Sequence, residues 1–318
     1  MNFLSKFQPV FIILSALSGI ALGKSKIINE QYTENGIQIF LVIMLFFVFL
    51  DIEIKKISTS FLDLRFSVSA LIINFIFTPL FAFVLSKLFL YGQIDLQTGF
   101  IMLLVTPCTD WYLIFTGVAN GNVPLGASIL PLNLILQIVL LPVYLLVFMR
   151  TGVSFGAGAV IYSIILVLII PMLIANAFKF ILKKINRQNI LAKIIKNSGD
   201  IQFIMLCLAI VSMFASKGTL LLANLILFIK LAPALLVFFV IVFCVSLFTG
   251  KILKLPFKNT IALVFTTQAR NSPVALALAV VTFPSRPLIS LVLVMGPLIE
   301  LPVLAVNSLI LKRQNRLL

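Results

Sequence analysis

Thr106-Pro107-Cys108-Thr109-Asp110-Trp111 is a polar hexapeptide that interrupts an otherwise apolar segment, with residues 100–105 before it and 112–115 after it. Pro107 removes a backbone donor and crowds the preceding turn, so a helix through this stretch is predicted to break or kink. Asp110 at membrane depth costs roughly 2.5–3.5 kcal/mol unless it faces a cavity or a partner. Secondary transporters place their binding sites at such broken helices. The stretch therefore indicates a transport site, with Thr106, Thr109 and Trp111 among its candidate residues.

The composition of the chain is that of an integral membrane protein. Of its 318 residues, 62% are hydrophobic and 10% are charged, and the mean hydropathy is +1.22. Soluble domains are about 45–50% apolar and about 25% charged. We therefore expect an all-α, multi-pass protein of the plasma membrane, surrounded by the lipid bilayer. The chain has no histidine, which excludes histidine-based metal sites and proton relays.

The apolar runs predict ten transmembrane helices, because each run is long enough to cross about 30 Å of hydrocarbon. The predicted spans are residues 7–23, 37–54, 66–90, 97–119, 124–149, 155–182, 200–216, 221–250, 259–283 and 288–311. Polar residues interrupt the fourth and the ninth span, which we expect to be broken helices that cross each other.

Lysine and arginine predict the orientation of the chain, because they are enriched in cytoplasmic loops. If the N-terminus is inside, the cytoplasmic segments hold 16 of these residues and the outer segments hold 6. This split predicts that both termini are cytoplasmic, in agreement with an even number of spans. The net charge of +15 then follows from topology and does not indicate nucleic acid as a partner.

An internal repeat relates the two interrupted segments. A shift of 160 residues places Asp110 over Arg270, and several apolar and proline positions match at the same offset. We therefore divide the chain into two repeats, residues 1–153 and residues 154–318. Each repeat holds five spans, an odd number, so the repeats are predicted to be inverted, as in many secondary transporters.

The second interruption, residues 266–273, again combines a proline with polar residues and a charge. We expect Asp110 and Arg270 to meet where the two broken helices cross, beside a polar pocket lined by freed backbone groups. The alternative is a purely structural ion pair that locks the crossing. Three more polar residues of this stretch are candidate transport residues: Gln268, Asn271 and Ser272.

Two further side chains could carry the transport chemistry. Cys108 sits in the first break, where its thiol could ligate a soft ion. The alternative for Cys108 is packing, which we expect for Cys207 and Cys244 in their apolar runs. Glu300 is a carboxylate within the last span, where it could exchange a proton or bind a cation. The alternative is a carboxyl group satisfied by a neighbouring helix.

The sequence lacks the components of an enzyme site. It has no histidine, no Gly-rich phosphate loop and no pair of intramembrane aspartates, so we expect neither catalysis nor a cofactor. A membrane sensor or scaffold would not require two broken helices at repeat-related positions. A carrier is therefore the favoured class.

Residues 106–116, followed by Gly121-Asn122, resemble the fourth span of arsenical-resistance transporters in the bile acid:sodium symporter superfamily. Residues 296–303 resemble the late glutamate-containing helix of that family, and the resemblance covers the whole chain in span number, broken helices and inverted repeats. It implies export of arsenite or antimonite in exchange for protons, by means of a cysteine in the fourth span and a late glutamate. By motif match these roles fall on Cys108, as the metalloid ligand, and on Glu300.

We therefore expect an antiporter that exports trivalent arsenic as the neutral hydroxide, with protons as the coupling ion. A carrier of a small organic anion, with Arg270 as the partner of the anion, stays open as an alternative, and so does a non-transporting membrane sensor. The two carriers differ at Cys108, because a thiophilic cargo requires the thiol and an organic acid does not.

Overall fold

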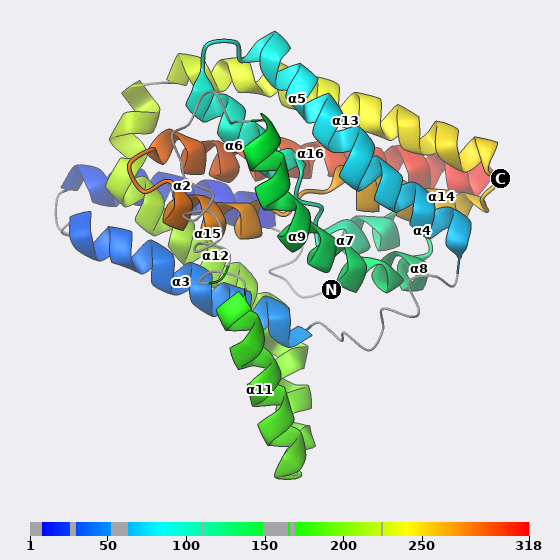
Figure 1. Ribbon diagram of the computed structural model, residues 1–318, viewed down its shortest axis with the longest axis horizontal. Coiled ribbons are helices and arrows are strands. Elements are labelled where there is room, and N and C mark those ends of the chain that lie inside the picture. The colour runs from blue at the N-terminus through cyan, green and yellow to red at the C-terminus, as the bar shows by residue number, and fades with distance from the viewer. Residues whose placement is uncertain are drawn as a thin grey trace. The chain divides into compact units, whose positions relative to one another are not determined.

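The computed structural model describes residues 8–25, 30–51, 63–109, 111–148, 165, 169–223 and 225–317 (Figure 1). The regular elements within these ranges are helices, which confirms the predicted all-α class. Asp110 and the greater part of residues 155–168 of the sixth predicted span lie outside the described ranges.

Five helices in the described ranges are long and apolar enough to cross a membrane. Their length and composition confirm the multi-pass membrane character. The five are Leu64–Phe89, Val123–Phe148, Gln188–Ser216, Ile229–Ile252 and Pro287–Asn315. Shorter apolar helices are Val10–Ser25, Asn35–Leu50, Ile94–Leu104 and Ser272–Thr282.

The chain forms two compact units, and each unit contains residues from both halves of the sequence. Unit 1 comprises Met1–Ile52, Phe155–Leu225 and Leu276–Val294. Unit 2 comprises Glu53–Ser154, Ile226–Ala275 and Met295–Leu318. The helices α15 (Ser272–Thr282) and α16 (Pro287–Leu317) contribute residues to both units.

Unit 1 is built around the long helix α12 (Gln188–Ala223), which packs against α2 (Gln8–Ser25) and α3 (Glu30–Asp51) (Figure 1). Helix α11 (Ile170–Lys184) lies against α3. The ammonium group of Lys179 on α11 donates to the carbonyl of Phe49 at 3.0 Å, near the C-terminal end of α3. A cation at this end complements the unsatisfied carbonyls and the dipole of the helix.

Two glycines allow α2 to approach the backbone of α12 closely. A Cβ atom on Gly19 would lie 2.5 Å from the carbonyl oxygen of Val211, and one on Gly23 would lie 2.4 Å from that of Ala215. The spacing of four residues places both glycines on the same face of α2. Small residues at this spacing are the usual device for close helix packing in membranes.

Unit 2 begins with a long helix that contains one π-helical turn. The segments are α4 (Leu64–Ile72), η2 (Ile73–Phe77) and α5 (Thr78–Phe89). The unit continues with α6 (Ile94–Leu104), α7 (Trp111–Val118), α8 (Val123–Ser128), α9 (Leu130–Phe148), α13 (Leu225–Ile252) and α14 (Phe257–Gln268), followed by the parts of α15 and α16 given above.

Three polar side chains connect the N-terminal ends of α4, α8 and α14. Asp63 caps α4 by accepting from the amide of Phe66 at 3.1 Å, and its other oxygen accepts from the side chain of Asn259 at 3.0 Å. The side chain of Asn122, the N-cap of α8, donates to Asn259 at 2.9 Å. The bond to Phe66 satisfies an amide at the start of α4, and the two side-chain bonds connect the caps of α4 and α8 to α14.

Both interruptions occur where the sequence predicts them. Helix α6 ends at Leu104, and the hydroxyl of Thr106 donates back to the carbonyls of Met102 and Leu103, each at 3.0 Å. Helix α14 ends at Gln268 because Ala269 has an extended backbone, with φ −70° and ψ 139°. The chain resumes as α7 at Trp111 and as α15 at Ser272.

Candidate functional site

The two interruptions pair with each other through their backbones. The amide of Cys108 donates to the carbonyl of Ala269 at 2.9 Å, and the amide of Asn271 donates to the carbonyl of Thr106 at 2.7 Å. Pro107 and Arg270 face each other as an antiparallel bridge between these bonds. Backbone groups released from a helix inside a membrane protein need partners. The two breaks supply partners to each other.

Arg270 is buried in this crossing, with 1% of its surface exposed. Its Nη1 donates to the carbonyl of Leu104 at 2.9 Å and its Nε to the carbonyl of Gln268 at 3.1 Å. Its Nη2 donates to the carbonyl of Thr267. Leu104 is the last residue of α6, and Gln268 is the last residue of α14. The guanidinium therefore lies at the negative ends of two helix dipoles.

An aromatic ring completes the surroundings of the guanidinium. The Cζ atom of Arg270 lies 5.1 Å from the ring centroid of Phe238 on α13, a cation–π geometry. The predicted ion pair with Asp110 stays a prediction, because Asp110 lies outside the described residues. The partners of Arg270 described above are backbone carbonyls and a ring, none of which sequence patterns indicate.

Glu300 reaches the same crossing from α16. Its Oε1 accepts from the backbone amide of Arg270 at 2.8 Å, and only 1% of its surface is exposed. Its Oε2 has no hydrogen-bond partner among the described residues. Gly296, one turn earlier, lets α16 approach α6, since a Cβ atom there would lie 2.6 Å from a methyl carbon of Leu103. One oxygen of the carboxyl group is thus fixed by the amide of Arg270, and the other can bind a proton or another hydrogen-bond partner.

The cysteines differ in their surroundings. Cys108 is buried in the crossing, with 5% of its surface exposed. Cys207 is half-buried in unit 1 and Cys244 is exposed on α13. None of the three forms a disulfide. Of the three thiols, that of Cys108 lies in the break with Arg270 and Asn271.

The other candidate residues lie around the same crossing. Asn271 caps α15 by accepting from the amide of Val274 at 3.2 Å, and its side chain donates to Thr109 at 3.3 Å. The side chain of Gln268 donates to the carbonyl of Phe239 at 2.7 Å and accepts from Asn307 at 3.0 Å. Four residues are buried at or beside the ends of the broken helices: Thr106, Thr109, Trp111 and Ser272.

A neutral polar cluster next to the crossing was not predicted from the sequence. Asn74 donates to the carbonyl of Thr266 at 3.1 Å, and Asn133 donates to the hydroxyl of Thr266 at 3.3 Å. Thr78 follows Asn74 by four residues and Gln137 follows Asn133 by four, so each pair lies on one helix face. All five side chains are buried.

Several atoms of this cluster have hydrogen-bonding capacity left over. Within the described part of the chain, Oδ1 of Asn74, Oγ1 of Thr78, Oδ1 of Asn133 and both polar atoms of Gln137 have no partner. Such buried groups normally bind water or a polar solute. The sequence signal that could have identified the cluster is the four-residue spacing of polar residues inside the apolar runs 66–90 and 124–149.

Comparison with known proteins identifies the family. Residues 38–224, more than half of the chain, match the sodium bile acid symporter family. The arsenical-resistance protein Acr3 of Corynebacterium glutamicum is 26% identical over 323 residues, which cover 96% of this chain and 87% of that protein. An uncharacterized transporter of Synechocystis is 23% identical over 336 residues, with the same coverage of both chains.

These similarities confirm the predicted resemblance to arsenical-resistance transporters. They also agree with the expectation that the protein carries out transport and no catalysis. The chain belongs to the sodium bile acid symporter family and is a membrane transporter, not an enzyme.

Proposed function

We propose that the protein is a secondary active transporter that exports arsenite or antimonite in exchange for protons. The observation that carries the proposal is the common location of Cys108, Glu300 and Arg270 at the crossing of two broken helices in unit 2. The similarity to a protein named for arsenical resistance supports the same cargo. Transport sites of secondary carriers are typically built at such broken helices.

The cargo is the neutral hydroxide of trivalent arsenic. A charged group alone cannot hold a neutral solute, whereas the Cys108 thiol can exchange for one of its oxygens: a sulfur–arsenic bond forms, and water leaves with the thiol proton. A single thiol is a weak ligand set, which suits a carrier that must release its cargo. The side-chain amides of Asn74, Asn133 and Gln137 can donate to and accept from arsenic-bound hydroxyls.

Arg270 supports a neutral cargo over an organic anion. Each of its three nitrogens already donates to a backbone carbonyl at the end of α6 or α14. A carboxylate is bound most strongly by two parallel N–H groups of a guanidinium. Three of the five N–H groups of Arg270 are used for the backbone carbonyls, so only two are left for a carboxylate, and a bidentate contact that includes Nε would have to break its bond to Gln268.

Glu300 is the group that exchanges the proton. It is a buried carboxyl whose Oε2 has no partner in the described residues, and buried carboxyl groups in membrane proteins typically mark proton pathways. Sodium is disfavoured as the coupling ion, because the cluster around Thr266 contains amides and hydroxyls without a carboxylate. The fixed charge of Arg270, four residues along the chain, would repel a sodium ion there.

The proposed architecture has ten spans in two inverted repeats, with both termini in the cytoplasm. The division of the chain into units supports the repeat. Unit 1 takes the first two predicted spans of each half, and unit 2 takes the remaining three, apart from residues Leu276–Val294. If the two halves are repeats offset by 160 residues, the boundary between the units should fall at the equivalent position in each half, after the second predicted span.

Arsenite uptake into inside-out membrane vesicles tests the proposed function. We expect vesicles that contain the protein to accumulate arsenite when a proton gradient is imposed. Cys108→Ser should reduce uptake to the level of vesicles without the protein. Cys207→Ser and Cys244→Ser are the matched controls, and they should retain uptake because neither thiol lies in the crossing.

Two outcomes would contradict the proposal. Full arsenite uptake by Cys108→Ser would show that the thiol only packs. Absence of arsenite uptake by the unmodified protein, together with flux of a small carboxylate, would favour the organic-anion carrier; absence of any flux would favour a sensor.

A further inference from the structure

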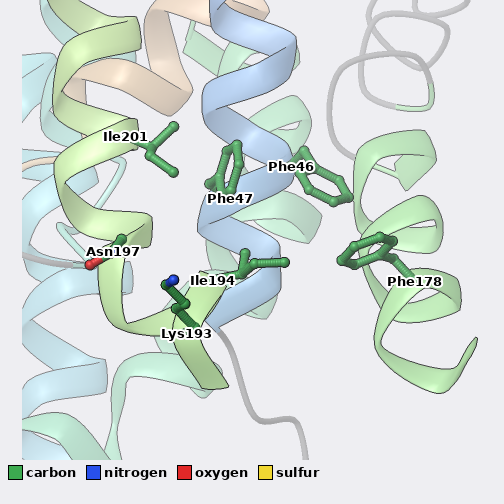
Figure 2. A pocket seen from close by; sticks show the side chains of 7 residues that line it. All are labelled: Phe46, Phe47, Phe178, Lys193, Ile194, Asn197 and Ile201. Atoms are coloured by element: carbon green, nitrogen blue, oxygen red, sulfur yellow. The ribbon is translucent and has the colours of Figure 1, made fainter. Parts of the chain in front are cut away.

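An aromatic pocket with a volume of ≈ 290 Å³ lies in unit 1 between α3, α11 and α12 (Figure 2). Phe46 and Phe47 reach it from α3, and Phe178 reaches it from α11. The rings of Phe46 and Phe178 meet edge to face, with centroids 5.7 Å apart. The pocket therefore has a wall of three aromatic rings contributed by two helices.

The opposite wall comes from the first turns of α12. Ile194 and Ile201 contribute apolar surface, whereas Lys193 and Asn197 contribute an ammonium and an amide group. Figure 2 shows Lys193 on the α12 side of the pocket, across from Phe178. Lys193 and Asn197 are exposed, so a ligand can reach their polar ends. Most of the pocket wall is therefore apolar, and its α12 side carries a cationic group.

The charge around the pocket is strongly positive. Between residues 179 and 200 the chain carries six basic residues and one acidic residue, Asp200. Besides Lys193, four of the basic side chains are exposed: Lys183, Lys184, Arg187 and Lys196. They occupy the C-terminal end of α11, the turn, and the start of α12. An anion that approaches the pocket is attracted by all of them.

The exposed face of α11 continues the apolar surface away from the pocket. Ile174 and Ile170 lie four and eight residues before Phe178 on the same face of α11, and both are exposed. Such side chains on a membrane protein contact lipid. The pocket can hold only a segment of one acyl chain, and the remaining chain can follow this face. Along the path from the basic residues through the pocket to α11, a ligand therefore meets a cationic, then an aromatic and then an aliphatic surface.

We propose that this pocket binds an anionic phospholipid, with the phosphate at Lys193 and Asn197 and one acyl chain against Phe46 and Phe178. Each basic residue near a membrane surface adds about 1 kcal/mol to the attraction of an anionic lipid. The proposed topology places this end of α11 and α12 at the cytoplasmic leaflet, which carries anionic lipids. The lipid site is independent of the proposed cargo, since it belongs to unit 1 and uses no residue of the crossing.

Native mass spectrometry of the full-length protein in detergent tests the site, with phosphatidylglycerol and phosphatidylcholine as probes. We expect the unmodified protein to bind phosphatidylglycerol more tightly. Lys193→Gln should weaken phosphatidylglycerol binding roughly fivefold and leave phosphatidylcholine binding unchanged. Phe178→Ala should weaken the binding of both lipids. The control is Lys251→Gln, which removes an exposed charge of unit 2 far from the pocket residues in the sequence.

Three results would overturn the proposal: equal affinity for the two lipids, an equal effect of Lys193→Gln and Lys251→Gln, or no effect of Phe178→Ala. The second result would mean that binding responds to net charge without a site. If Phe178→Ala does not fold, Phe178→Leu keeps an apolar side chain and removes only the ring. Its phosphatidylglycerol affinity should then fall between those of the unmodified protein and Lys193→Gln.

Discussion

Within the described part of the chain, the buried guanidinium of Arg270 donates to helix ends, while the Glu300 carboxylate accepts from its backbone amide. An uncompensated buried cation is costly. The C-terminal end of a helix carries about half an elementary charge of negative sign. The guanidinium bonds to the ends of both α6 and α14, and two such ends amount to about one elementary charge. Arg270 therefore holds the two broken helices together.

Arg270→Gln should destabilise the protein severely, because the carbonyls of Leu104 and Thr267 lose their donors. We expect a loss of about 3–5 kcal/mol, the range for breaking a buried charge interaction. Thermal unfolding of the purified protein in detergent measures it. Arg313→Gln, which removes an exposed cation, is the control and should change little.

The same experiment decides the role of Asp110. If the carbonyls are the main partners of Arg270, Asp110→Asn should cost much less than Arg270→Gln, and the two effects should add. An Asp110→Asn loss as large as that of Arg270→Gln, with no further loss in the double variant, would identify the carboxylate as the partner.

Glu300→Gln should fold but lose proton-driven transport. Glutamine keeps an oxygen that can accept from the amide of Arg270, so the contact at 2.8 Å can persist. It cannot release a proton, so arsenite uptake should no longer respond to an imposed pH difference. Glu300→Asp keeps a carboxyl group and should retain part of the response. Unchanged pH dependence in Glu300→Gln would exclude this residue as the proton carrier.

The sequence predicted the residues of the crossing better than their partners. Pro107, Cys108, Arg270 and Glu300 stand out because polar residues are rare and costly in apolar runs. Among the described residues, the guanidinium of Arg270 donates its hydrogen bonds to backbone carbonyls, which every residue has, so no residue pattern reveals them. The cluster of Asn74 and Asn133 around Thr266 depends on long-range contacts between three helices, which a single apolar run does not specify.

Among the helices, the π-helical turn Ile73–Phe77 is an example of structure that the sequence did not indicate. Tyr144 on α9 donates to the carbonyl of Phe75 at 2.6 Å, a carbonyl at the centre of this turn. The turn carries Asn74, which bonds to Thr266. Such turns occur frequently at functional sites. The residues 73–77 themselves are apolar apart from Asn74, so their composition predicts only an ordinary span.

The contact between α2 and α12 should depend on its glycines. Gly19→Ala and Gly23→Ala each place a methyl group within 2.5 Å of a backbone oxygen of α12. The helices must then separate, at a cost of about 1–3 kcal/mol. Gly199→Ala is the matched control, because nothing lies within 4 Å of its Cβ position. In that helix interior, alanine should instead stabilise by roughly 0.5–1 kcal/mol.

Unfolding of the three alanine variants in detergent, compared with the unmodified protein, checks this contrast. A loss of stability in Gly199→Ala equal to that of Gly19→Ala would mean that the close approach of α2 and α12 is not what the glycines provide.

At the scale of the whole molecule, the two compact units can be compared with the predicted repeat. Sequence proximity alone would group the spans of each half, yet each compact unit draws on both halves. The crossing in unit 2 also joins one break from each half, at Pro107 and Arg270. Two related halves that each supply one broken helix are the usual construction of a secondary carrier. The offset of 160 residues in the sequence predicted that the two broken helices correspond. The division into units could not be predicted, because it depends on contacts between segments far apart in the sequence.

The orientation of the two halves is the remaining prediction, and it concerns the chain as a whole. The split of 16 to 6 basic residues places both termini in the cytoplasm, and five spans per half then place the connection near Arg150 outside. A green fluorescent protein fused after Leu318 should fluoresce, because it folds only inside. Alkaline phosphatase inserted after Arg150 should be active, because it functions only outside. Phosphatase activity after Leu318 would reverse the topology. If both junctions lie on the same side of the membrane, the second half crosses an even number of times, which contradicts two inverted repeats of five spans each.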